Sequence, residues 1–104
     1  MSLATRTLGR SNLTVTVLGF GTAPLGDLYA RLDDATAIAT VEAALAAGIT
    51  LLDTSPHYGN GLAEHRCGTA LRRHRRDGLV LSTKVGRVMD PRQPPAAPAR
   101  SDVA

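Results

Sequence analysis

The sequence predicts an α/β fold whose parallel strands are joined by helical crossovers. Three apolar runs end at Thr22, Asp53 and Thr83, about thirty residues apart, which is the length of one strand–helix unit. Helix-type patterns fill the two intervals, so the chain is expected to run strand, helix, strand, helix, strand. Strands joined through a helix in this way lie parallel to each other.

A β-hairpin is expected ahead of the first parallel strand. Apolar residues and threonines alternate from residue 13 to residue 17, which is typical of a strand with one apolar face. The turn-forming segment 9–12 separates this strand from a shorter one at residues 5–8. The first parallel strand then follows at residues 17–22.

Both predicted helices have recognisable ends. Asp33 or Asp34 can cap the first helix, apolar residues follow at spacings of three and four, and Gly48 closes it. The second helix is expected over residues 62–74, and Asp77 with Gly78 turns the chain into the third strand. Two helices cannot cover three parallel strands on both faces, as such sheets require. The architecture therefore looks incomplete.

The chain is expected to divide near residue 88. Residues 1–88 carry the strand and helix patterns, whereas residues 89–104 are rich in Pro, Ala and Arg. No pattern of a further strand follows Lys84. The segment 89–104 is therefore predicted to be a disordered tail.

Composition favours a small cytoplasmic protein that binds neither a membrane nor nucleic acid. The 104 residues suit one small domain, no apolar run nears the ~20 residues of a membrane helix, and no signal pattern opens the chain. A net charge of +3 and three aromatic residues give no reason to expect nucleic-acid binding. Cys67 is the single cysteine, which suits a reducing compartment. His65 and Cys67 would splay apart on a helix, so no metal site is expected.

Lys84 is the only lysine among the 12 basic residues, the others being arginine. It follows a strand, and a compact ammonium there can tune the proton affinity of a neighbour at close range, which a guanidinium cannot. The preceding strand ends on Asp53, and Tyr58 comes five residues later. An acid, a phenol and an amine at the ends of adjacent strands can form a proton-transfer site.

Structural alternatives remain open for two features. The loop after Asp53 can be an ordinary strand–helix connection in which Asn60 caps the helix and Tyr58 packs. The basic run at residues 72–76 can be the solvated end of a helix, where cations are favoured, or it can bind anions or nucleic acid.

The chain resembles the aldo-keto reductases over residues 7–88. The segments that carry the resemblance are LGRSNLTVTVLGFGTAPLG, GITLLDTSPHYGNGLAEHRCGTAL and LSTKVGR. The glycine-rich loop with Leu62, Glu64 and Arg66 looks most like the branch that acts on free sugars, of the aldose or fucose 1-dehydrogenase type. The resemblance implies a (β/α)8 TIM barrel with a leading hairpin, of which this chain supplies the hairpin and about three strands.

The resemblance also implies roles for particular residues. Asp53, Tyr58 and Lys84 match three members of the family's catalytic tetrad, whereas the fourth, a histidine on a later strand, has no counterpart here. Tyr58 would give a proton in reduction and take one in oxidation, and Lys84, held by Asp53, would favour its phenolate. Gly21, Thr22 and Asp53 would contact the nicotinamide–ribose end of NADP or NAD.

Two expectations for function follow. The first is an NAD(P)-dependent oxidoreductase that interconverts a carbonyl, in an aldehyde, ketone or aldose, and an alcohol or lactone. The alternative is a truncated and inactive partial barrel that self-associates or needs a completing chain, because an uncovered strand edge favours association.

Overall fold

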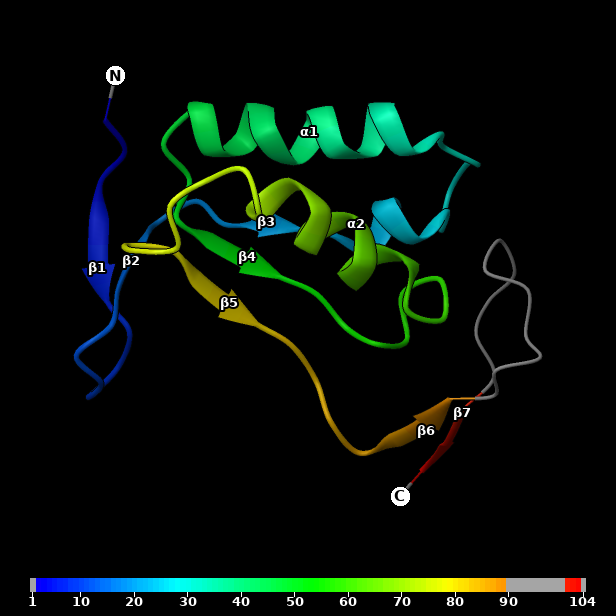
Figure 1. The fold of residues 1–104 in the computed structure, drawn as a ribbon. Helices are drawn as coiled ribbons and strands as arrows, with labels where there is room; N and C mark the ends of the chain where they lie inside the picture. The colour runs from blue at the N-terminus through cyan, green and yellow to red at the C-terminus, as the bar shows by residue number, and fades with distance from the viewer. Residues whose placement is uncertain (1, 90–100, 104) are drawn as a thin grey trace.

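The computed structural model describes residues 2–89 and 101–103 and shows an open α/β layer (Figure 1). None of its helices in these residues is long and apolar enough to cross a membrane. The strands are β1 (Thr5–Thr7), β2 (Thr14–Thr16), β3 (Phe20–Gly21), β4 (Leu51–Asp53), β5 (Val80–Ser82), β6 (Arg87–Met89) and β7 (Ser101–Val103). The helices are the 3-10 turn η1 (Ala23–Gly26) and the α-helices α1 (Asp34–Ala46) and α2 (Leu62–Leu71).

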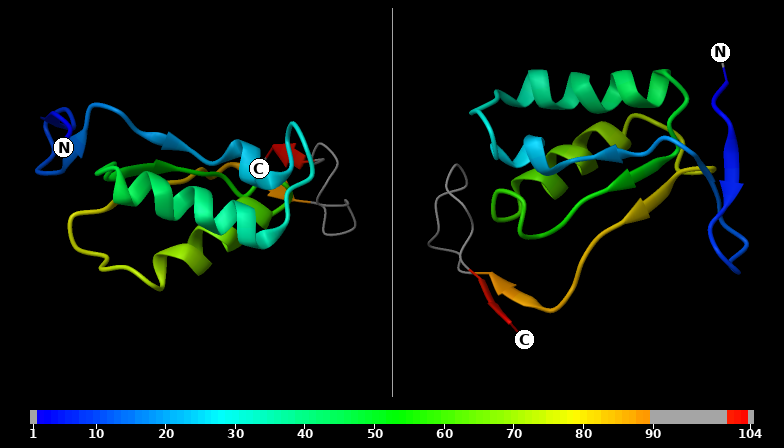
Figure 2. Two further views of the ribbon diagram at one scale, coloured as in Figure 1. Left: turned by 90° about the horizontal axis from the view of Figure 1, so that it is seen from above. Right: turned by 180° about the vertical axis from the view of Figure 1, so that it is seen from behind.

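The central sheet consists of β3, β4 and β5 in that order, all parallel. Both α-helices lie on one face of it, as Figure 2 shows from two sides. No further strand of the described residues joins this sheet, and no barrel closes. The predicted α/β fold with three parallel strands and an incomplete barrel is therefore confirmed.

The core lies between this sheet and the two helices. Leu52 of β4 is fully buried, and Val41 of α1 and Cys67 of α2 pack in the same cluster. Several of the other core side chains are alanines, which let the helices approach the sheet closely. Burial of the Cys67 thiol raises its pKa, because desolvation disfavours the thiolate.

The ends of α1 follow the sequence closely. Asp33 is the capping residue, and its Oδ1 accepts a hydrogen bond of 2.7 Å from the Thr36 N–H. At the other end Gly48 has φ +97°, the left-handed conformation that follows many helices. The Gly48 N–H donates to Leu45 O at 3.0 Å.

Helix α2 is shorter than predicted, since it ends at Leu71 and not at residue 74. The N–H groups of Arg73 and His74 donate to carbonyls only three residues back, at 3.1 Å each. These tighter bonds satisfy the carbonyls of the last helical turn. The helix therefore ends where the basic run begins. The N-cap position is occupied by Gly61, with φ +98°, and not by Asn60, which the alternative interpretation of the loop places there.

The predicted hairpin is present, and β1 pairs with β2 in an antiparallel arrangement. Thr16 fastens it to the main sheet through two reciprocal bonds: the Thr16 N–H donates to Thr50 Oγ1 at 3.0 Å, and the Thr50 N–H donates to Thr16 Oγ1 at 3.1 Å. The hairpin therefore lies at the end where the parallel strands begin (Figure 1). The hairpin therefore does not cover the opposite end of the sheet, where the parallel strands finish.

The structure corrects one expectation for the C-terminal part. A strand does follow Lys84: β6 pairs with β7 in an antiparallel arrangement, separate from the central sheet. Strands of three residues leave no periodic signal in the sequence, and their pairing depends on a distant partner. Residues 89 and 101–103 lie in these two strands, and the disorder expected for residues 89–104 stays a prediction. Most of the predicted tail, residues 90–100, lies outside the described residues, and the boundary near residue 88 stays a prediction.

Candidate active site

Asp53 and Lys84 meet at the carboxyl ends of two adjacent strands. Asp53 pairs in register with Ser82, and Lys84 lies two residues further on, so both side chains are on the same face of the sheet. Lys84 Nζ donates to Asp53 Oδ2 and to Thr54 O, at 2.9 Å each. Two acceptors from one strand end thus hold the single lysine in place.

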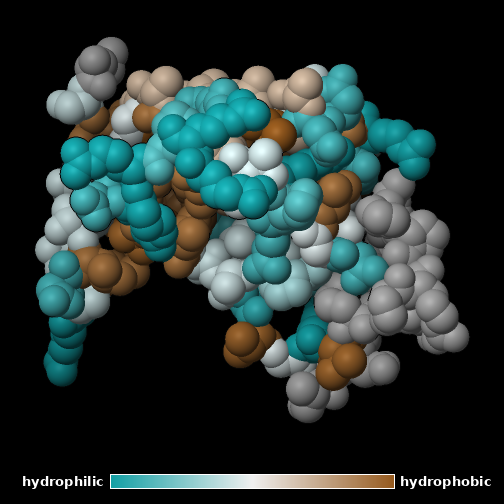
Figure 3. Space-filling model, viewed as in Figure 1, coloured by the Kyte–Doolittle hydropathy of each residue, from teal (hydrophilic) through white to brown (hydrophobic). Residues whose placement is uncertain are grey.

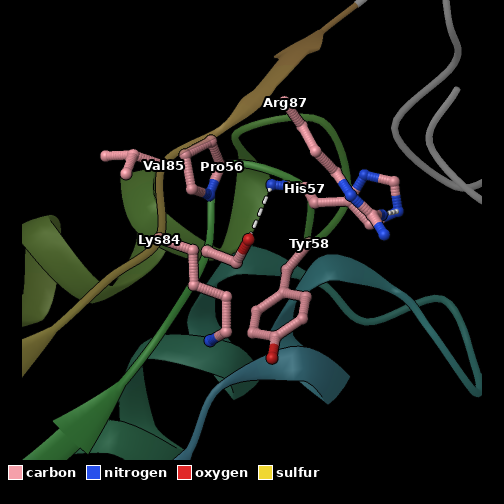
Figure 4. A pocket seen from close by; sticks show the side chains of 7 residues that line it. Pro56, His57, Tyr58, Lys84, Val85 and Arg87 are labelled. Carbon is pink, nitrogen blue, oxygen red and sulfur yellow. Dashed lines mark hydrogen bonds between the residues drawn. The ribbon is translucent and has the colours of Figure 1, made fainter. Parts of the chain in front are cut away.

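Tyr58 is brought to the same place by the loop after β4. Lys84 Nζ lies 5.0 Å from the centre of the Tyr58 ring, within the range of a cation–π contact. In Figure 4 the Tyr58 hydroxyl and the Lys84 ammonium point in the same direction. The structure therefore gathers Asp53, Tyr58 and Lys84, which the sequence analysis singled out, into one group.

The ion pair shifts the proton affinity of both partners. The hydrogen bond from Lys84 lowers the pKa of Asp53; partial burial opposes this shift, and a bond from Ser82 adds to it. The same bond to Asp53 raises the pKa of Lys84. Both side chains are therefore charged around neutral pH, and the ammonium beside Tyr58 is permanent there.

The Tyr58 loop is held by close backbone packing against η1. A Cβ atom on Gly26 would lie 2.5 Å from the carbonyl carbon of Tyr58, and one on Gly59 would lie 2.6 Å from Gly26 O. Gly59 also has φ +66°. Only glycine at both positions allows this approach, which fixes the height of Tyr58 above the sheet.

Arg66 ties α2 to the segment between η1 and α1. Its side chain is almost fully buried and donates to Leu25 O at 2.9 Å and to Leu32 O at 2.7 Å. It also pairs with Asp27 at 3.0 Å and Asp34 at 2.9 Å. Burial opposes ionisation of Asp27, but bonds from the Leu32 N–H and from Arg66 outweigh it and lower the pKa of Asp27. The sequence analysis assigned Arg66 no such role. Its partners lie more than thirty residues away in the sequence, so no local pattern indicates these contacts.

Gly21 and Thr22 lie beside Asp53 at the end of β3. The Thr22 N–H donates to Asp53 O at 2.9 Å, and Gly21 is exposed with open space where a Cβ would be. The hydroxyls of Thr22 and Thr54 are buried and have no hydrogen-bond partner in the described part of the chain. Such orphaned hydroxyls fit a site that a polar group completes, and the nicotinamide–ribose end of a cofactor has that chemistry. Their role in cofactor binding stays a prediction.

A pocket of about 260 Å³ adjoins this group. Seven residues line it: Ser55, Pro56, His57, Tyr58, Lys84, Val85 and Arg87. Sequence reasoning missed His57 and Arg87. The distance between His57 Nε2 and Arg87 Nη1 is 3.3 Å. The only available signal was that Arg87 closes the LSTKVGR segment.

The remaining candidates have structural explanations. In the basic run, Arg73 pairs with Glu42 at 3.4 Å and Arg75 pairs with Asp77 at 3.1 Å, both largely in solvent. These contacts favour the solvated helix end over a binding surface. Within residues 2–89 and 101–103, no group of three or more potential ligands is arranged to hold a metal ion.

Comparison with known proteins identifies the family. The model of the aldo/keto reductase family matches residues 17–102. The chain belongs to this family. It is 49% identical over 98 residues to a pyridoxal 4-dehydrogenase from Microbacterium luteolum, covering 89% of this chain and 28% of that protein. It is 47% identical over 81 residues to a D-threo-aldose 1-dehydrogenase from a Pseudomonas species, covering 78% and 25%. The aldo/keto reductase chain thus spans about a quarter of these relatives.

Solved structures agree with this assignment. An aldo-keto reductase from Bacillus halodurans, in its holo form, superposes with a TM-score of 0.78 at 35% identity, over 96% of this chain and 30% of that one. The glycerol dehydrogenase of Gluconobacter oxydans gives a TM-score of 0.76 at 25% identity, also over 96% and 30%. The resemblance to aldo-keto reductases, including the aldose dehydrogenase branch, is confirmed.

Proposed function

We propose that this chain provides the proton-transfer part of an NAD(P)-dependent oxidoreductase, which interconverts a carbonyl and an alcohol, or an aldose and its lactone. The observation that carries the proposal is the position of Lys84, bonded to Asp53 and facing the ring of Tyr58. Membership of the aldo/keto reductase family supports it, as do relatives named for dehydrogenation of an aldose and of pyridoxal.

The chemistry needs a proton at the oxygen while a hydride reaches the carbon. The nicotinamide supplies or accepts that hydride when it is bound. In reduction, the Tyr58 hydroxyl donates its proton to the oxygen of the carbonyl, so the product is a neutral alcohol. The positive charge of Lys84 stabilises the phenolate that remains, and Asp53 keeps the ammonium in position. In oxidation, the same phenolate removes the proton.

The finer parts of the proposal rest on separate observations. Gly21, Thr22 and Asp53 would contact the nicotinamide–ribose end of NADP or NAD, supported by the buried Thr22 hydroxyl that lacks a partner in the described residues. The substrate would be a small carbonyl compound or sugar, in keeping with a pocket of about 260 Å³. A cytoplasmic location is favoured by the single cysteine, which is free and buried.

A chimaera tests the role of Tyr58. Residues 1–89 replace the matching region of the Pseudomonas D-threo-aldose 1-dehydrogenase, and turnover is measured with a reactive aldehyde and with an aldose. Tyr58→Phe should slow the chemical step by about 10²-fold or more while cofactor binding is kept, because only the hydroxyl is lost. Tyr29→Phe is the matched control, since Tyr29 is highly exposed and lies outside the pocket. Equal rates for both variants would disprove the proposal.

A second candidate function is self-association without catalysis. In the described residues β5 has a partner on one side only, and Val85 beyond it is almost fully exposed. Figure 3 shows separate hydrophobic areas along the lower side of the molecule, where the segment from β5 to β6 runs. Unpaired strand edges with apolar neighbours favour association. Size-exclusion chromatography of the 104-residue polypeptide checks this, and a compact monomer would exclude it.

A further inference from the structure

The pocket beside Tyr58 contains one cation that is paired with a carboxylate and one that no carboxylate of residues 2–88 neutralises. Its first cation, Lys84, is paired with Asp53 at 2.9 Å. The second, Arg87, takes part in no ion pair with the side chains of residues 2–88, and its side-chain hydrogen bond within that range is with the ring of His57. Arg87 is therefore the lining cation whose charge has no carboxylate partner among the side chains of residues 2–88.

The contact with His57 orients Arg87 without cancelling its charge. A guanidinium has only N–H donors, so in this contact of 3.3 Å His57 Nε2 can act only as the acceptor. His57 Nδ1 is buried and has no partner in the described part of the chain. The ring thus contacts one nitrogen of the Arg87 guanidinium, Nη1, and the N–H groups on its other nitrogens do not take part in this contact.

The two polar features of the pocket lie apart. In Figure 4 the hydroxyl of Tyr58 and the ammonium of Lys84 point away from the side chains of Arg87 and His57. Pro56 and Val85 add apolar surface to the same lining. A volume of about 260 Å³ suits a small molecule that has a polar group at each end.

We propose that Arg87 is a specificity-determining residue that binds the anionic group of a small carbonyl substrate, either a carboxylate or a phosphate, while the carbonyl lies at Tyr58. The fork of a guanidinium matches both anions through two parallel hydrogen bonds. Of the two cations that line the pocket, Arg87 is the one without a carboxylate partner among the side chains of residues 2–88. The inference rests on the proposed oxidoreductase function and adds the class of its substrate.

Paired substrates in the chimaera test this role. Succinic semialdehyde is compared with butanal, and glycolaldehyde phosphate with glycolaldehyde, so the two arms separate a carboxylate from a phosphate. Arg87→Gln should lower kcat/KM by about tenfold or more for one or both anionic substrates, as expected when a hydrogen bond between charged groups is lost. The neutral substrates should be unaffected. Arg10→Gln, which removes the same charge in the turn of the hairpin, should change neither.

A binding measurement makes the result independent of turnover. In the chimaera without nicotinamide cofactor, succinate and inorganic phosphate are titrated while the Arg87 Nε–H signal is followed by NMR. At least one anion should shift this signal at concentrations that leave the Arg10 signal unchanged. An unshifted Arg87 signal, or equal losses for charged and neutral substrates, would overturn the role of Arg87. Absence of turnover with every substrate together with a specific Arg87 shift would count against the proposed function alone.

Discussion

The α-carbon of Gly26 packs against the backbone of Tyr58 so closely that a Cβ atom there would lie 2.5 Å from the Tyr58 carbonyl carbon. The contact joins the turn after β3 to the loop after β4. It involves backbone on both sides, which cannot move away as the end of a flexible side chain can. The position of the candidate proton donor therefore depends on the absence of a side chain at residue 26.

Gly26→Ala in the chimaera should destabilise the fold and impair turnover together. Forcing a methyl group into this contact costs about 1–3 kcal/mol, and displacing Tyr58 by about 1 Å can cost as much as 10²-fold in rate. Thermal unfolding and kcat measure the two effects. Gly68→Ala is the matched control, since a Cβ there meets nothing within 4 Å. In a helix interior that change should stabilise by about 0.5–1 kcal/mol. Similar behaviour of the two variants would contradict the role of the contact.

Lys84→Arg in the chimaera should lower kcat although the charge is retained. A planar guanidinium cannot occupy the position of the ammonium, which bonds Asp53 Oδ2 and Thr54 O and also faces the Tyr58 ring. We expect a loss of about tenfold or more, as for other groups that support proton transfer. Steady-state kinetics with a fixed aldehyde measure it. Near-full kcat would break the link between the single lysine and catalysis.

The Asp53–Lys84 pair should persist over a wide pH range. The pKa of Asp53 is lowered from 3.8, so the stabilising contribution of the pair is present above 3.8 and is lost as the pH falls through the lower value. The pKa of Lys84 is raised from 10.5, so its contribution is present below 10.5 and is lost as the pH rises through the higher value. NMR titration of the Asp53 carboxyl carbon in the chimaera checks the acid side. Lys84→Met should move the midpoint upward, and an unchanged midpoint would refute the pairing.

The 104-residue polypeptide by itself should show no steady-state turnover at rates typical of enzymes, on the order of 1 s⁻¹ or more. It spans 25–28% of the relatives with the named activities above. Its three histidines all precede Lys84, so none matches the later histidine that the family resemblance implies. An assay with NADPH or NADH and a reactive aldehyde measures this. Turnover with the purified polypeptide would show that residues 1–104 suffice.

Local patterns were enough to predict the parallel sheet and the group around Lys84. Apolar runs that end on Asp53 and shortly before Lys84 place both at the same edge of the sheet, whatever the details of packing. The N-cap of α1 shows where such reasoning stops. Asp33 and Asp34 are equally good caps by residue type, and Asp34 pairs instead with Arg66, thirty-two positions away.

The unpredicted features all depend on contacts between distant segments. Arg87 of β6 meets His57 of the loop after β4, and β6 pairs with the distant segment Ser101–Val103. The buried position of Arg66 likewise depends on carbonyls of another segment, Leu25 and Leu32. A local sequence pattern carries no information about contacts between residues that are far apart in the sequence.

Lys84 is a unique side chain to which a spectroscopic label can be attached. Because it is the only lysine, reductive methylation with carbon-13 formaldehyde would mark a single side chain besides the amino terminus. Methylation keeps the positive charge, so the label would still carry the ammonium character of the site. Its chemical shift would respond to the charge of Asp53 and to the ring current of Tyr58. Occupancy of the pocket can then be followed without assigning any other resonance.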